Sequence, residues 1–332
     1  MTKVSDRINR LAESATLAMA RMSRELQAKG IDVIALSLGE PDFDTPEFIK
    51  EAAKKAIDDN FSHYTPVPGC PELRRAIVQK FKRDNYLEYS IDQIVTSTGA
   101  KQSLANVCLS LLNEGDEVLV PCPYWVSYAE IIKLAEGIPV EIPSTIATDF
   151  KVSADELEAA ITPKTKLLMF SSPCNPSGTV YTRDELTSIA KMLEKYPDIY
   201  IISDEIYEHI NFTDAHFSIG TIPSMKERTI TVNGVSKGFA MTGWRVGFMG
   251  APLWIAKACN KVQGQITSAT CAIAQKAGET AMLAEPKAVT TKMKNTFLER
   301  RDMLLILLDY YKLHHHELKN LKSHIVIQEL RR

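Results

Sequence analysis

Short apolar runs alternate with helical patterns along most of the chain from about residue 90. Six runs rich in apolar and β-branched residues predict strands, and three stretches between them have the periodicity of helices. The predicted strands are 94–97, 117–120, 166–170, 199–203, 229–232 and 246–249, and the predicted helices are 102–112, 183–193 and 253–261. This order is typical of βαβ units and predicts an α/β fold with a mostly parallel sheet.

The N-terminal segment has a helical pattern of its own. Ala18, Met22 and Leu26 recur every four positions, and Gly30 follows as a helix C-cap. The pattern does not decide whether this helix packs on its own chain or on another subunit.

Composition narrows the functional classes. The 332 residues include 39 Lys and Arg against 41 Asp and Glu, a net charge of −2. We therefore expect neither a nucleic acid nor a membrane surface as partner. The 45% of hydrophobic residues supply a sizeable core and exclude a disordered chain.

The apolar stretches and the cysteines indicate the cellular location of the protein and whether it binds a metal. No apolar stretch approaches the ~20 residues that cross a bilayer, and the N-terminus has no apolar signal segment, so we expect a cytoplasmic protein. The six cysteines form no C-x-x-C pair, which argues against a zinc site or a disulfide framework. We expect no metal.

Candidate chemistry lies where the predicted strands end, because ligands of open α/β sheets bind beyond the carboxyl ends of the strands. The turn at Thr98, Gly99 and Ala100 joins a strand to a helix, and it is either an anion site or a simple tight turn. The chain has neither a Walker A spacing nor a G-x-G-x-x-G motif, which weakens a nicotinamide-dependent dehydrogenase.

Three charged residues near these ends each allow two interpretations. Asp204 follows an apolar strand and needs a cationic partner, either a structural Arg or a protonated ring nitrogen. Lys237 is either an exposed loop lysine or an amine with a lowered pKa that bonds to an aldehyde. Arg245 is either part of a surface ion pair or a phosphate ligand. Together these groups fit a ligand with a phosphate, a basic ring nitrogen and an aldehyde, as in pyridoxal 5′-phosphate.

Six ordered motifs make a family resemblance specific. Residues 236–247 resemble the cofactor-attachment motif of class I pyridoxal-phosphate-dependent aminotransferases, and bacterial aspartate aminotransferases are the most similar group. Five further segments agree in the same order, namely 38–43, 64–66, 123–128, 175–178 and 203–207. The resemblance extends from about residue 5 to about residue 305.

The resemblance implies a fold-type I transferase that works as a homodimer. Its large domain would hold a mostly parallel seven-stranded sheet flanked by helices, beside a smaller α/β domain that is incomplete here. We divide the chain into an N-terminal arm with part of the small domain (1–45), the large cofactor domain (46–285) and an incomplete C-terminal small domain (286–332).

The resemblance also implies residue roles. Lys237 would hold the cofactor covalently and move the substrate proton, Asp204 would keep the ring nitrogen protonated, and Tyr207 with Asn175 would bond the ring oxygen. Trp125 would stack on the ring. The phosphate would be held by Gly99, Ala100, Lys101, Ser236 and Arg245, and by Tyr64 of the neighbouring subunit.

The implied substrates are amino acids and 2-oxo acids. Lys101 would bind the distal carboxylate of a dicarboxylic substrate, unless it is a solvated charge on the first helical turn. The other implied substrate contacts are Gly39, Trp125, Asn175, Ser14 and Thr16. The expected reaction is ping-pong transfer of the amino group from L-aspartate to 2-oxoglutarate.

Beyond residues 303–305 the family pattern ends. The expected Arg that clamps the substrate α-carboxylate is absent, and the tail contains His314, His315 and His316. We interpret the tail as a shifted reading frame or an early stop rather than as a metal-binding run, and we expect impaired activity. Two alternatives remain, namely another fold-type I enzyme (an aromatic, aliphatic or prephenate aminotransferase, or a carbon–sulfur lyase) and a non-catalytic truncated product.

Overall fold

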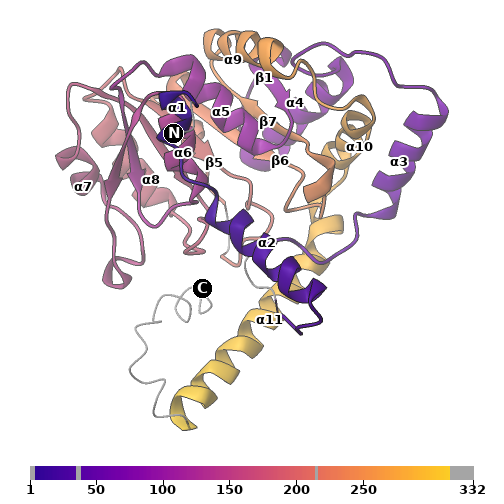
Figure 1. Ribbon diagram of the computed structural model, residues 1–332. Helices are drawn as coiled ribbons and strands as arrows, with labels where there is room; N and C mark the ends of the chain where they lie inside the picture. The colour runs from indigo at the N-terminus through magenta and orange to yellow at the C-terminus, as the bar shows by residue number, and fades with distance from the viewer. Residues whose placement is uncertain (1–3, 35–38, 214–215, 315–332) are drawn as a thin grey trace.

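The computed structural model describes residues 4–34, 39–213 and 216–314. In these residues the strands form one seven-stranded sheet with the order β1-β7-β6-β5-β4-β2-β3 (Figure 1). The strands are β1 Ile94–Ser97, β2 Glu117–Pro121, β3 Ile138–Ile142, β4 Thr165–Ser171, β5 Tyr200–Asp204, β6 Thr229–Gly234 and β7 Gly247–Gly250. The expected seven-stranded α/β fold is confirmed.

Strand directions determine where the loops meet. β7 is antiparallel to both of its neighbours, β1 and β6, whereas β2, β3, β4, β5 and β6 pair in parallel. The carboxyl ends of β1, β4, β5 and β6 therefore lie at one edge of the sheet. Because β7 runs the other way, the residues just before it lie at that edge too.

Six of the seven strands match the sequence prediction to within about two residues at each end. The strand that the pattern missed is β3, at the end of the sheet, where Pro139 and Glu141 interrupt the apolar positions. An edge strand buries less than a central one, so its apolar signal is weaker.

Helices cover the sheet (Figure 1). One apolar core joins α5 and α9 to one region of the sheet, a second lies between the sheet and α8, and a third packs α3, α4 and α10 together. The α-helices are α1 Asp6–Asn9, α2 Ala15–Ala28, α3 Glu47–Asp58, α4 Pro71–Asn85, α5 Ala100–Leu111, α6 Ser127–Leu134, α7 Ala154–Ala159, α8 Arg183–Leu193, α9 Leu253–Ile266, α10 Ala272–Leu283 and α11 Pro286–His314. Short 3₁₀ turns lie at Ile91–Gln93, Ile146–Thr148, Ile219–Thr221, Lys226–Arg228 and Thr242–Trp244.

Local signals explain where the predicted helices begin. α8 begins at the predicted residue because Thr182 and Glu185 form a capping box, each side chain accepting a hydrogen bond from the other residue's backbone N–H. α5 begins at Ala100, directly after Gly99, whose φ of +83° is the left-handed conformation that glycine adopts without strain.

The two ends of the described chain are helical. The predicted N-terminal helix is α2, and Gly30 follows it with φ +80°. Just before it, Arg7 pairs with Glu136 at 3.1 Å and the Ala12 N–H donates to Glu130 at 2.8 Å, so this part of the arm contacts its own chain. At the other end α11 extends from the body (Figure 1). No described helix has the length and apolarity that spanning a bilayer requires.

Candidate active site

A cavity of about 1030 Å³ opens at the sheet edge where these strand ends meet. Most of the predicted site residues line it, although they come from segments far apart in the sequence. They are Ser14, Gly39, Ala100, Lys101, Trp125, Asn175, Asp204, Tyr207, Ser236, Lys237 and Arg245. The rule that ligands bind beyond the carboxyl ends of parallel strands therefore located a real concavity.

Asp204 lies at the floor of this cavity, at the end of β5, and is 4% exposed. Its carboxylate accepts hydrogen bonds from the Tyr128 hydroxyl at 2.7 Å and from the Ile206 N–H at 3.2 Å. Burial raises the pKa of Asp204 to about 6, because these two hydrogen bonds only partly offset the loss of hydration. Within the described residues no Arg or Lys forms an ion pair with it, so the structural-arginine interpretation finds no support.

Lys237 lies on the neighbouring strand connection, three residues after β6 ends. Its amine donates to the carbonyl oxygen of Gly39 at 2.5 Å and lies 5.6 Å from the centroid of the Tyr207 ring. Burial lowers the pKa of Lys237, which favours the neutral, nucleophilic amine. The geometry therefore argues against an ordinary exposed loop lysine.

Tyr207 and Asn175 approach each other from the ends of β5 and β4. The Asn175 side-chain amide donates to the Tyr207 hydroxyl at 3.3 Å. Burial and the nearby Asp204 raise the pKa of Tyr207 to about 12, so its hydroxyl keeps its proton near neutral pH and can donate a hydrogen bond.

Arg245 lines another part of the cavity, and its guanidinium lies against Gly99. A guanidinium N–H of Arg245 donates to the Thr98 carbonyl at 3.4 Å and another donates to the Thr242 carbonyl at 2.9 Å. A Cβ atom on Gly99 would lie 2.2 Å from Arg245 Nη2, so only glycine admits this guanidinium beside the start of α5. A helix N-terminus, a guanidinium and the Ser236 hydroxyl thus line one side of the cavity, which is the donor set of an anion site.

Lys101 and Trp125 lie together at the cavity wall. The Lys101 ammonium is 4.6 Å from the centroid of the Trp125 ring. Partial burial, with the charge of Arg245, lowers the pKa of Lys101. The Trp125 ring also packs edge-on against Tyr128, with centroids 5.8 Å apart.

Three predicted residues stand apart from the cavity lining. Gly99 lies next to the Arg245 guanidinium, directly before α5. Tyr64, in the loop between α3 and α4, is 100% exposed and is not among the residues that line the cavity. Thr16 lies on α2, and its side chain is outside the described part of the chain. So are residues 315–332, which include His315 and His316 of the tail.

The structure adds residues to which the sequence assigned no role. Tyr128 is fully buried and holds Asp204. Glu40 lines the cavity and accepts a hydrogen bond from the Thr242 hydroxyl. Tyr128 and Glu40 both stand inside segments that agree with the family, so position within a motif was the available signal.

Comparison with known proteins agrees with this geometry. The family model described as aminotransferase class I and II matches residues 31–324, so the match extends beyond residue 305, near which the resemblance was expected to end. The aspartate/prephenate aminotransferase of Cereibacter sphaeroides is 45% identical to this chain over 314 residues, covering 94% of this chain and 78% of that protein. A protein of the same name from Nitrosomonas europaea is 45% identical over 304 residues, covering 91% of this chain and 76% of that protein.

Solved structures show the same fold. The aspartate aminotransferase of Thermus thermophilus, solved with maleate, superposes with a TM-score of 0.91 at 40% identity, covering 94% of this chain and 81% of that one. The aspartate aminotransferase of Rhizobium meliloti gives a TM-score of 0.90 at 39% identity, covering 93% and 78%. The chain belongs to the class I and II aminotransferases.

Proposed function

We propose that this aminotransferase uses pyridoxal 5′-phosphate to transfer the amino group of L-aspartate to 2-oxoglutarate. The observation that carries the proposal is the placement of Lys237 and Asp204 on neighbouring strand ends, facing one cavity. One supplies an amine with a lowered pKa and the other a buried carboxylate without an ion-pair partner among the described residues. Family membership supports the reaction class.

The residues present fit this cofactor. Asp204, buried and with a raised pKa, suits a partner that brings its own positive charge, which a protonated ring nitrogen does. Ala100 at the start of α5, Ser236 and Arg245 suit the phosphate. Lys237 suits the aldehyde, and Trp125 offers an aromatic face at the cavity wall. When bound, the cofactor supplies an aldehyde carbon that carries the amino group and a ring that accepts electrons.

The chain's own groups would handle the protons. Lys237 Nζ, neutral because burial lowers its pKa, would take the proton from the substrate Cα. The Tyr207 hydroxyl and the Asn175 amide would donate hydrogen bonds to the ring oxygen. The Asp204 carboxylate, held by Tyr128, would fix the proton on the ring nitrogen. Gly39 and Trp125 would confine the substrate and exclude water.

Substrate class rests on Lys101. Its ammonium faces the cavity beside Trp125 and is not paired with a carboxylate within the described residues, so it is available to a second substrate carboxylate. Two similar proteins support the same choice by name: the Thermus thermophilus enzyme was solved with maleate, a dicarboxylate, and the Cereibacter sphaeroides protein is named an aspartate/prephenate aminotransferase. The name of the Cereibacter sphaeroides protein also favours prephenate, another dicarboxylate, as a second acceptor of the amino group.

Tyr64 supports a homodimer. Its side chain is fully exposed although it belongs to a motif of the family, and we infer that it reaches the cofactor phosphate of a second copy. Sedimentation of the cofactor-loaded chain and of Tyr64→Phe tests this inference. A dimer whose cofactor affinity falls on that substitution supports it, and a monomer with unchanged affinity contradicts it.

The direct test is an absorbance assay with cofactor, L-aspartate and 2-oxoglutarate. We expect aspartate alone to convert the aldehyde form of the cofactor to the amine form, and 2-oxoglutarate to reverse the change. Conversion by aromatic or aliphatic amino acids, with none by aspartate, would favour the alternative aminotransferases. Loss of a thiol from a sulfur-containing amino acid would favour the lyase.

A further inference from the structure

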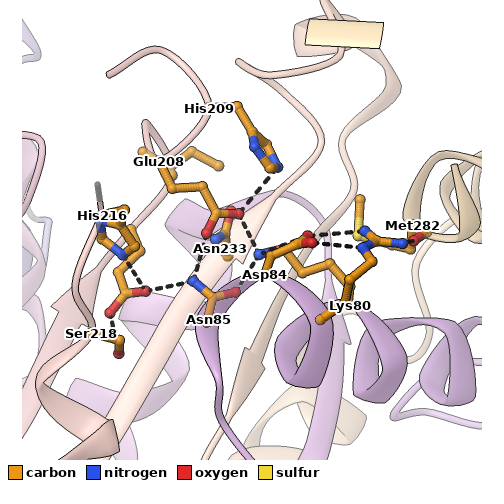
Figure 2. A network of polar contacts seen from close by, with 12 residues as sticks. Lys80, Asp84, Asn85, Glu208, His209, His216, Ser218, Asn233 and Met282 are labelled. Atoms are coloured by element: carbon orange, nitrogen blue, oxygen red, sulfur yellow. Dashed lines mark hydrogen bonds and ion pairs between the residues drawn. The ribbon is translucent and has the colours of Figure 1, made fainter. Parts of the chain in front are cut away.

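A buried polar network joins the end of α4 to the residues that follow β5 (Figure 2). The Lys80 ammonium, on α4, pairs with Glu208 and donates to the Asn85 side-chain oxygen at 2.5 Å. The Asn85 amide donates to Glu208 at 2.6 Å and to Glu205 at 3.1 Å. Lys80 is 1% exposed and Glu205 0%, so these charges are removed from water.

Each buried carboxylate of the network has a nitrogen partner, Lys80 for Glu208 and His216 for Glu205. Burial alone would raise the pKa of Glu208, but the charges of Lys80 and the neighbouring histidines hold it well below its usual value. Glu205 accepts hydrogen bonds from Ser203 at 2.9 Å and Ser218 at 2.6 Å, and contacts His216 Nε2 at 2.8 Å. Although Glu205, Glu208 and His216 bring possible metal-ligand atoms within 4.8 Å of one another, Lys80 already supplies the positive charge, so we interpret the group as an ion-pair network.

One member of this network touches the segment that carries the reactive lysine. His209 Nε2 lies 3.3 Å from Glu208 Oε1 (Figure 2). Its ring packs edge-on against Phe239, with centroids 5.7 Å apart and an interplanar angle of 82°. A Cβ atom on Gly238 would lie 2.8 Å from His209 Cδ2, which leaves no room for any side chain there. His209 therefore lies beside the Glu208 carboxylate on one side and against Gly238 and Phe239 on the other.

We propose that His209, braced by Glu208 and Lys80, is a positioning residue that fixes the backbone following Lys237 through direct contact with Gly238 and Phe239. The proposal rests on the proposed function only in naming Lys237 as the reacting amine. It connects α4 to the site through packed side chains: Lys80 holds Glu208, Glu208 holds His209, and His209 limits where Gly238 can lie. A misplacement of about 1 Å at a reacting group can cost about 100-fold in rate, so this support has a functional consequence.

Gly238→Ala and His209→Ala test the contact. Gly238 does not have a positive φ, so its backbone conformation is open to alanine, and the three atoms nearest to an added methyl group all belong to His209. The readout is competitive acetylation of the cofactor-free chain at several pH values, with peptide mass spectrometry, expressed as labelling of Lys237 relative to exposed Lys55. This readout requires neither cofactor nor turnover, so it stands even if the proposed function fails.

We expect Gly238→Ala to change the Lys237 to Lys55 labelling ratio by about threefold or more. In a His209→Ala background the same substitution should change the ratio by less than about twofold, because the opposing ring is gone. An equal effect of Gly238→Ala in both backgrounds, or no effect in either, would overturn the proposal. Gly264→Ala is the matched glycine control, since its Cβ would meet only Val67 side-chain atoms at 3.8 Å. His63→Ala is the control for His209→Ala, because it removes a histidine at an exposed position.

A second variant tests whether Glu208 and Lys80 hold His209 in place. Glu208→Gln alone would leave the buried Lys80 ammonium with Asp84, 3.6 Å away, in place of its closer partner Glu208. Lys80→Met and Glu208→Met are therefore introduced together, so that neither buried charge loses its partner alone. We expect this pair to change the Lys237 to Lys55 labelling ratio relative to the unaltered chain, because His209 loses the carboxylate beside it. An unchanged ratio in a chain with unaltered circular dichroism would show that packing alone positions His209, and would overturn the part of the proposal that assigns bracing to Glu208 and Lys80.

Discussion

Tyr128 donates a 2.7 Å hydrogen bond to Asp204 beneath the cavity, with both side chains buried. The hydroxyl lowers the pKa of the carboxylate, while burial raises it to about 6. A buried aromatic residue on α6 thus sets how readily the carboxylate at the end of β5 carries its charge. The carboxylate can hold a protonated ring nitrogen only when it is ionised.

Tyr128→Phe is expected to weaken cofactor binding. The substitution removes the hydroxyl and keeps the ring, so packing against Trp125 is retained. A hydrogen bond to a charged group contributes about 1.5–3 kcal/mol, so we expect cofactor affinity to fall by about tenfold or more. Fluorescence titration of the chain with cofactor measures this affinity. Unchanged binding would show that Asp204 does not depend on the hydroxyl.

Asp204→Asn is expected to stabilise the cofactor-free chain while abolishing tight cofactor binding. The folded pKa of about 6 lies above the ordinary value of 3.8. The stability that Asp204 contributes is therefore complete below about pH 4 and is lost as the pH rises to about 6. Replacing the carboxyl group with a neutral amide avoids this loss, which amounts to about 2–3 kcal/mol near pH 8.

Urea unfolding of the wild-type chain and of Asp204→Asn at pH 4.5 and pH 8 tests the direction of this pH dependence. The variant should gain stability over the wild type at pH 8 and less at pH 4.5. A difference in the free energy of unfolding between the two proteins that does not depend on pH would mean that Asp204 titrates normally in the folded chain.

Gly99→Ala is expected to weaken cofactor binding more than it destabilises the fold. The added methyl group would meet Arg245 Nη2 at 2.2 Å and displace the guanidinium from the start of α5. Gly115→Ala is the matched control, because Gly115 has φ +85° but no heavy atom within 4 Å of the position of an added Cβ. Gly99→Ala should lose about 1–3 kcal/mol of stability, because φ +83° with ψ +157° is a conformation that essentially only glycine adopts. Gly115→Ala should lose about 1–2 kcal/mol from its positive φ, and only Gly99→Ala should lose affinity for the cofactor. Equal affinity in the two variants would contradict the phosphate role of Arg245.

Lys101→Met is expected to lower kcat/KM for aspartate by about tenfold to 100-fold, the effect of removing one charge-assisted hydrogen bond. Activity with an amino acid that has no second carboxylate should change little. Lys257→Met, at an exposed position on α9, serves as the control for a lost positive charge. A similar loss for both kinds of substrate would place Lys101 in cofactor binding rather than in substrate selection.

Much of the fold and site could be predicted because the chemistry follows the strand ends. Asp204 and Lys237 each follow a buried strand, and parallel pairing brings their ends to one edge whatever the helices between them do. Arg245 reaches the same edge only because β7 is antiparallel, which the strand pattern did not indicate. The sequence likewise could not assign Tyr128 or His209, since their roles depend on which buried groups face them across the fold.

The most direct measurement is reductive trapping of the loaded chain. The chain is mixed with pyridoxal 5′-phosphate, treated with borohydride, digested and examined by mass spectrometry, with Lys237→Ala treated in parallel. We predict that one peptide, the one containing Lys237, carries the added mass of the reduced cofactor and that the variant carries none. Stable modification at another lysine in both proteins, or no modification of a folded chain, would contradict the account.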